Sequence, residues 1–113
     1  MRAIGLLVAL GLICSAHSAA ADDKSLSAQE LHGKQVYGRT CIYCHGPGVW
    51  GTNRLAKRVD KDHAQLETRT DLSAATIRTV VRTGIGSMPP LRRTELSDAD
   101  VDAIAAYLTR QGR

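Results

Sequence analysis

The five residues CIYCH, from Cys41 to His45, combine side chains that can do chemistry at a spacing that suits one kind of cofactor. Two thiols three positions apart lie on one turn, where they can form thioether bonds to the two vinyl groups of a haem. The imidazole of His45 is then held under the iron as its proximal ligand. The motif therefore predicts one covalently bound haem c, attached through Cys41 and Cys44 and ligated by His45.

Three other interpretations of the cysteine pair are open. A dithiol redox pair usually lies in a βα context. Zinc usually takes four protein ligands, and the sequence has no second cysteine pair. A plain disulfide is compatible with an exported protein. None of the three explains the histidine directly after the second cysteine, so haem attachment is favoured.

A second candidate iron ligand lies in the stretch GIGSMPP, where Met88 is the only methionine besides Met1. The glycines and prolines around it predict a loop between two helices, from which Met88 can approach the iron opposite His45. A thioether is a soft, neutral ligand that raises the potential of haem iron. A lone methionine often fills a gap in a core, but such a residue usually belongs to a helical stripe. Met88 does not, so we expect it as the distal ligand, with the helix residue His32 and the loop residue His63 as weaker candidates.

Three helices must position these residues. Each begins with a serine at the N-cap, one apolar residue before it and another four positions after it; these caps are Ser27, Ser73 and Ser97. Apolar residues at helical spacing follow each start, and Gly84 is expected to end the second helix. No alternating pattern indicates a strand. Residues 46–71 are expected to form a loop with a short helical turn over Asn53 to Val59, so the predicted fold class is all-α.

The N-terminus predicts a secretory signal peptide over residues 1–21. A positive start, an apolar run from Ala3 to Cys14 and a cleavage site at Ala19 to Ala21 follow one another before Asp22. The run is too short for a membrane anchor, which needs about 20 apolar residues. We expect residues 22–113 to form one exported, periplasmic domain with no stable membrane insertion.

Composition bounds the remaining possibilities. The chain of 113 residues carries a formal net charge of +4, without a basic run and with only 4% aromatic residues, so nucleic-acid binding is not indicated. It has no phenylalanine, which leaves little large apolar volume for a core and favours a cofactor inside the domain. Basic side chains follow the cysteine motif and the Met88 loop, either as a solvated surface or as the border of a docking face: Arg54, Lys57, Arg58, Lys61, Arg92 and Arg93. Asp98, Asp100 and Asp102 are expected to be helix-start charges favoured by the dipole.

The chain resembles the class I c-type cytochromes over residues 27–110. The resemblance rests on CIYCH, on the Met88-Pro89 loop, on Gly33 and Tyr37 in the first helix and on Tyr107 in the last. It implies that these two helices cross, with the glycine letting their backbones approach and the tyrosines packing at the contact. It also implies a mono-haem, Met/His-ligated carrier of single electrons that cycles between Fe(II) and Fe(III). A haem enzyme or sensor with an open sixth site is the alternative, although no distal acid–base residue is seen near the Met88 loop.

Within that family, CHGPGVWGTNRLAKR and IRTVVRTGIGSMPPL are similar to the cytochrome subunits of p-cresol methylhydroxylase-type flavoprotein dehydrogenases. This similarity implies an FAD-containing dehydrogenase as the redox partner. One departure concerns the carbonyl that usually orients the proximal histidine, because Thr52-Asn53 stand where the family usually has Gly-Pro. Either a different carbonyl between Pro47 and Asn53 accepts from His45, or this loop is reshaped.

Overall fold

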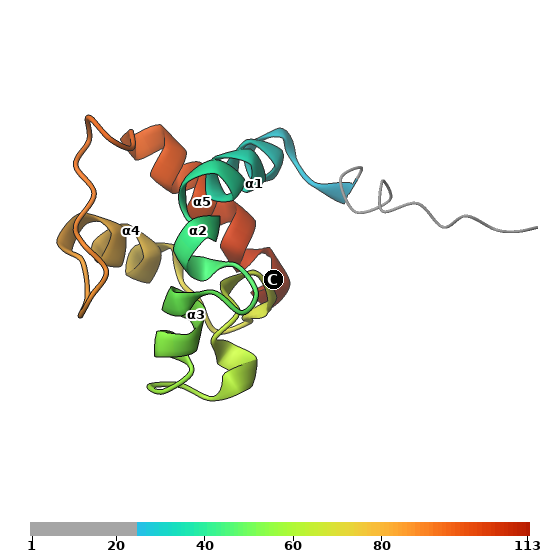
Figure 1. The fold of residues 1–113 in the computed structure, drawn as a ribbon. Coiled ribbons are helices and arrows are strands. Elements are labelled where there is room, and N and C mark those ends of the chain that lie inside the picture. The colour runs from blue at the N-terminus through green and yellow to red at the C-terminus, as the bar shows by residue number, and fades with distance from the viewer. Residues whose placement is uncertain (1–24) are drawn as a thin grey trace, which may run out of the picture.

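The computed structural model describes residues 25–113, so the expected signal peptide and its cleavage site lie outside the described residues. Within 25–113 the structure contains helices and turns, and no strand beyond an isolated bridge between Ile85 and Met88. The all-α prediction is confirmed. The α-helices are α1 (Ala28–Thr40), α2 (Ile42–His45), α3 (Trp50–Leu55), α4 (Ala74–Thr83) and α5 (Asp98–Thr109), and the 3₁₀ turns are η3 (Lys61–His63), η4 (Leu66–Thr68) and η5 (Arg110–Gly112) (Figure 1). No helix in this part of the chain is both long and apolar enough to cross a membrane.

The three predicted serine caps are present. The hydroxyls of Ser27, Ser73 and Ser97 each accept the backbone N–H three residues later. At α1 the carboxylate of Glu30 also accepts from the N–H of Ser27, at 2.7 Å, which completes a capping box. At α5 the matching carboxylate of Asp100 accepts from the Ser97 hydroxyl instead, at 2.8 Å. The start of α5 therefore has a serine cap without a closed capping box.

The helices α1 and α5 pack closely against each other and cross in Figure 1. A Cβ placed on Gly33 would lie 2.0 Å from the carbonyl oxygen of Ala103, so the glycine is required by space. The rings of Tyr37 and Tyr107 pack beside this point, with centroids 6.0 Å apart. Both features match the expected helix crossing. The surrounding core also takes buried apolar side chains from α1, α4, α5 and the approach to α5: Val36, Ile77, Val81, Leu96, Val101, Ile104, Ala105 and Leu108.

The segment after α2 is more ordered than predicted. The expected turn over Asn53 to Val59 is present in part, since the N–H of Val59 donates to the Leu55 carbonyl at 3.0 Å. The helical segment begins earlier than predicted, because α3 starts at Trp50 and ends at Leu55. The reason is packing: a Cβ on Gly51 would lie 2.3 Å from the carbonyl oxygen of Cys44, so the start of α3 rests directly on α2. The turns η3 and η4 then lead to α4.

The α1–α5 contact generates a stability prediction. Replacing Gly33 by alanine places a methyl group inside the Ala103 carbonyl contact and must push the helices apart. Overpacking of this kind costs about 1–3 kcal/mol, and each kcal/mol lowers Tm by about 4–8 °C in a domain of this size. Thermal unfolding of the haem-loaded protein, followed by circular dichroism, measures the loss.

Gly38 provides the matched control, because it lies on the same helix and a Cβ there would meet nothing within 4 Å. Gly38→Ala should leave Tm unchanged or raise it, since alanine favours a helix over glycine by up to about 1 kcal/mol. Equal Tm values for the two variants would contradict the steric account of Gly33.

Candidate haem site

The two cysteines lie on one turn that directly continues α1. The N–H of Cys41 donates to the backbone carbonyl of Tyr37 at 2.9 Å. The N–H groups of Cys44 and His45 donate back to the Cys41 carbonyl at 3.1 and 2.8 Å. Cys41 is half-buried against the core, whereas Cys44 is exposed, and both are free thiols. Burial, with a smaller contribution from Cys44, raises the pKa of the Cys41 thiol to about 11. A dithiol redox pair needs a lowered pKa, so this environment does not favour that interpretation.

His45 has the properties of a neutral metal ligand. Burial lowers the pKa of its imidazole, which favours the neutral form that binds metals. Its Nδ1 is buried and has no hydrogen-bond partner within residues 25–113, an arrangement that is rare for a buried polar atom. The Tyr37 hydroxyl donates to the backbone carbonyl of His45 at 3.1 Å and so fixes the main chain that carries the ring. The site therefore fits an imidazole that ligates iron.

Thr52 and Asn53, which stand where the family usually has Gly-Pro, form hydrogen bonds with the loop after His45. The buried Thr52 hydroxyl donates to the carbonyl of Gly46 at 2.7 Å, and the Asn53 side-chain amide donates to the carbonyl of Gly48 at 3.0 Å. Two loop carbonyls thus accept hydrogen bonds from α3. In the described part of the chain no carbonyl accepts from His45 Nδ1, so of the two alternatives an acceptor between Pro47 and Asn53 is not seen.

Met88 lies on a tight hairpin between α4 and α5. Gly84 ends α4 with a φ of +69°, as predicted. Ile85 and Met88 then exchange both backbone hydrogen bonds at 3.0 Å across a turn in which Gly86 has a φ of +59°. These positive φ values favour glycine. A Cβ on Gly84 would also lie 2.5 Å from the Met88 carbonyl oxygen, so the two glycines make this hairpin possible.

The cysteine turn and the Met88 hairpin border the same apolar core. Cys41, Ile42, Met88 and Leu91 are all half-buried and packed against the cluster formed by α1, α4 and α5. The large exposed apolar side chains of the described residues come from the cysteine turn, the start of α3 and the Met88 hairpin: Tyr43, Trp50 and Ile85. A porphyrin has large apolar faces, so this apolar surface next to thiol, imidazole and thioether groups fits the predicted cofactor.

The two weaker ligand candidates, His32 and His63, take part in surface contacts. His32 Nε2 lies 2.7 Å from a carboxylate oxygen of Asp100, and its side chain is 48% exposed. His63 Nδ1 lies 4.0 Å from a carboxylate oxygen of Asp60. Both histidine side chains are partly exposed and contact surface carboxylates, which agrees with their rank as the weaker ligand candidates.

Some charged residues do more than the sequence indicated. The acidic residues at the start of α5 reach other elements, since Asp98 pairs with Arg82 and Arg93, and Asp102 pairs with Arg78. In the basic cluster, the guanidinium group of Arg54 lies 5.9 Å from the centre of the Trp50 ring. Sequence reasoning missed Thr52 and Arg82 as residues that hold the site's backbone. Nothing in the local pattern separates Arg82 from Arg78 one turn earlier, so only the tertiary contacts reveal it.

Comparison with known proteins identifies the family. Residues 28–108 match the family model described as cytochrome c oxidase, cbb3-type, subunit III. The chain is also 30% identical over 109 residues to the cytochrome c subunit of 4-cresol dehydrogenase [hydroxylating] from Pseudomonas putida, covering 96% of this chain and 81% of that protein. No solved structure gives a significant match. Together with the helix crossing and the CIYCH turn, these matches show that the chain belongs to the c-type cytochromes, as an all-α, class I electron carrier with covalently bound haem c.

Proposed function

We propose that this protein is an exported, single-haem electron carrier in which Cys41 and Cys44 bind the porphyrin and His45 and Met88 ligate the iron. The observation that carries the assignment is that the cysteine turn and the Met88 hairpin pack against one apolar cluster, although they lie far apart in the sequence. The bound haem supplies one-electron chemistry by cycling between Fe(II) and Fe(III).

The chain's own residues keep the ligands in neutral form and in place. Burial lowers the pKa of the His45 imidazole, which favours its neutral form, and the Tyr37 hydroxyl donates to the backbone carbonyl of the same residue. The Met88 thioether carries no charge, and its side chain is half-buried on a hairpin closed by two backbone hydrogen bonds. Such pre-organisation limits competition from water for the distal position.

For the redox partner, we propose an FAD-containing dehydrogenase that oxidises a phenol. The support is the similarity to the 4-cresol dehydrogenase subunit over nearly the whole chain. Near the candidate site, Trp50 is 60% exposed and the basic residues Arg54, Lys57 and Arg58 lie at the surface. Charges of one sign beside an exposed apolar group steer an acidic partner and raise the association rate more than the affinity.

The first test concerns Met88. Met88→Ala removes the thioether, so the far-red charge-transfer band of the ferric protein should disappear. The reduction potential of the haem should also fall by on the order of 0.1 V or more, because axial ligands tune haem potentials over about 0.8 V. Ser87→Ala, at the exposed neighbouring position, is the control and should keep both properties. A wild-type protein that lacks the band and binds CO readily in the ferrous state would instead have an open sixth site.

The second test concerns the partner. A tagged copy produced in its native host should co-purify with a protein that shows FAD absorbance, and adding a phenolic substrate of that protein should reduce the haem. The association rate should fall as salt rises, since screening weakens steering between exposed charges. Recovery of the cytochrome as a free monomer at low salt would argue against the subunit assignment.

The third test concerns export. If residues 1–21 are a cleaved signal peptide, the protein recovered from the periplasm should begin at Asp22. Its intact mass should correspond to residues 22–113 plus one haem, with no mass left for residues 1–21. A protein that keeps these residues and fractionates with the membrane would show that they act as an anchor.

A further inference from the structure

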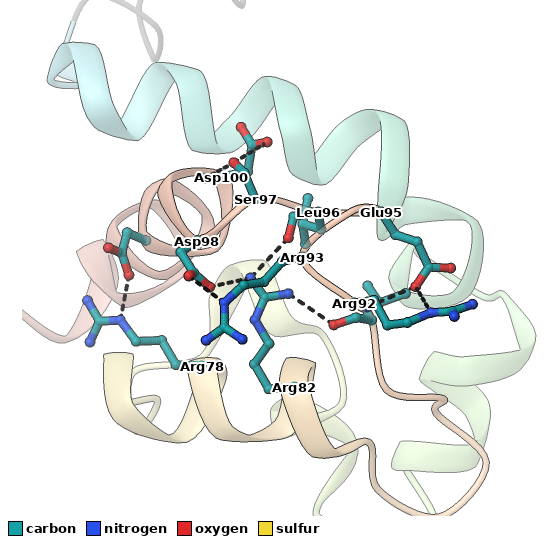
Figure 2. Close-up of polar contacts among 11 residues, drawn as sticks. Arg78, Arg82, Arg92, Arg93, Glu95, Leu96, Ser97, Asp98 and Asp100 are labelled. Carbon is teal, nitrogen blue, oxygen red and sulfur yellow. Dashed lines mark hydrogen bonds and ion pairs between the residues drawn. The ribbon is translucent and has the colours of Figure 1, made fainter.

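Arg82, near the end of α4, contacts three separate points around the connection that carries Met88. Its guanidinium group donates to the backbone carbonyls of Leu91 and Leu96, both at 3.0 Å, and to the carboxylate of Asp98 at 2.6 Å. Figure 2 shows the side chain extending from α4 toward the start of α5, with dashed lines to Leu96 and Asp98. The contacts use two separate nitrogens of one planar guanidinium group, whereas a lysine has a single nitrogen from which to donate.

These contacts hold the chain directly after Met88. Leu91 is fixed at both of its backbone groups, because its N–H donates to the Val81 carbonyl at 2.8 Å and its carbonyl accepts from Arg82. Leu96, which is buried, lies immediately before the N-cap of α5. Arg82 therefore ties the hairpin to the end of α4 on one side and to the start of α5 on the other.

The three contacts differ in how much they should contribute. The Asp98 carboxylate is 60% exposed and also pairs with Arg93 at 2.7 Å, and exposed ion pairs of this kind contribute little. The two carbonyl contacts are partly buried, and the Arg82 side chain is only 19% exposed. Hydrogen bonds from a charged donor are stronger than neutral ones, and a buried acceptor left unpaired is costly. The carbonyl contacts are therefore the ones expected to hold the loop.

We propose that Arg82 is a positioning residue for the distal ligand: by holding the Leu91 and Leu96 carbonyls, it keeps the Met88 hairpin where the thioether remains bound to the iron. This inference rests on the proposed Met88 ligation. Its consequence concerns loop opening. Without Arg82 the hairpin should release Met88 more often, and a competing ligand should take its place more easily.

The test uses the haem-loaded ferric protein and exogenous imidazole as the competing ligand. Loss of the far-red charge-transfer band during the titration reports displacement of Met88. Arg82→Met removes all three contacts and keeps a long apolar side chain. We expect imidazole to half-saturate this variant at a concentration lower by about tenfold or more, which corresponds to about 1.4 kcal/mol of lost preference for the closed loop.

The matched control is Arg78→Met. Arg78 lies one turn earlier on α4 and pairs with Asp102 of α5 at 2.6 Å (Figure 2). Among the described residues it makes no hydrogen bond or ion pair with the Met88 loop. This variant loses an arginine and an inter-helix ion pair but should titrate like the wild type. Asp98→Asn separates the ion pair from the carbonyl contacts and should change imidazole binding less than threefold.

A second measurement separates positioning from general stability. On heating, Arg82→Met should lose the far-red band at a temperature clearly below its unfolding temperature by circular dichroism. Arg78→Met should keep the wild-type interval between the two transitions. Arg82→Lys, which can reach one acceptor but not three, should fall between the wild type and Arg82→Met. Arg82→Lys is the deciding variant if the Arg82→Met protein cannot be produced in folded form.

The outcomes distinguish this inference from the proposed function. If the wild-type protein lacks the thioether band, Met88 is not the ligand and both proposals are wrong. If the band is present, but the available Arg82 variants bind imidazole like the wild type and lose the band only on unfolding, Met88 ligation stands and the role of Arg82 is refuted.

Discussion

The backbone contact between Gly33 of α1 and Ala103 of α5 is the constraint on which the rest of this structure depends. With no Cβ at Gly33, the two helices approach until the Ala103 carbonyl lies against the Gly33 backbone. The rings of Tyr37 and Tyr107 pack beside this contact. The cysteine turn continues α1 directly, and the Met88 connection leads into α5. The crossing therefore sets the relative position of two segments that the sequence keeps far apart.

The composition of the chain explains why this crossing needs a cofactor beside it. The sequence contains no phenylalanine, and the core of residues 25–113 is built mainly from aliphatic residues and two tyrosines. Small domains with little apolar volume are often marginal without a covalent or metal staple. A covalently bound haem provides both large apolar faces and a bond to the chain. The half-buried Cys41, Ile42, Met88 and Leu91 are placed to share that apolar surface with the core.

Polar contacts from helices hold the loops that carry the ligands. Thr52 and Asn53 of α3 donate to loop carbonyls after His45, and Arg82 of α4 donates to carbonyls after Met88. Backbone carbonyls in partly buried loops need donors, since an unpaired one is costly. Each helix therefore positions the neighbouring loop as well as packing the core. The carboxylates at the start of α5, expected as charges favoured by the helix dipole, join this arrangement through their arginine partners.

The sequence by itself determined the local features: the serine caps, the turn with Cys41, Cys44 and His45, and the glycine that ends α4 before Met88. Such features depend on neighbouring residues, whose spacing is visible in the chain. Tertiary structure alone decided the start of α3, which follows from packing against α2. It also decided the role of Arg82, because its acceptors lie on a distant loop and spacing alone cannot distinguish it from Arg78.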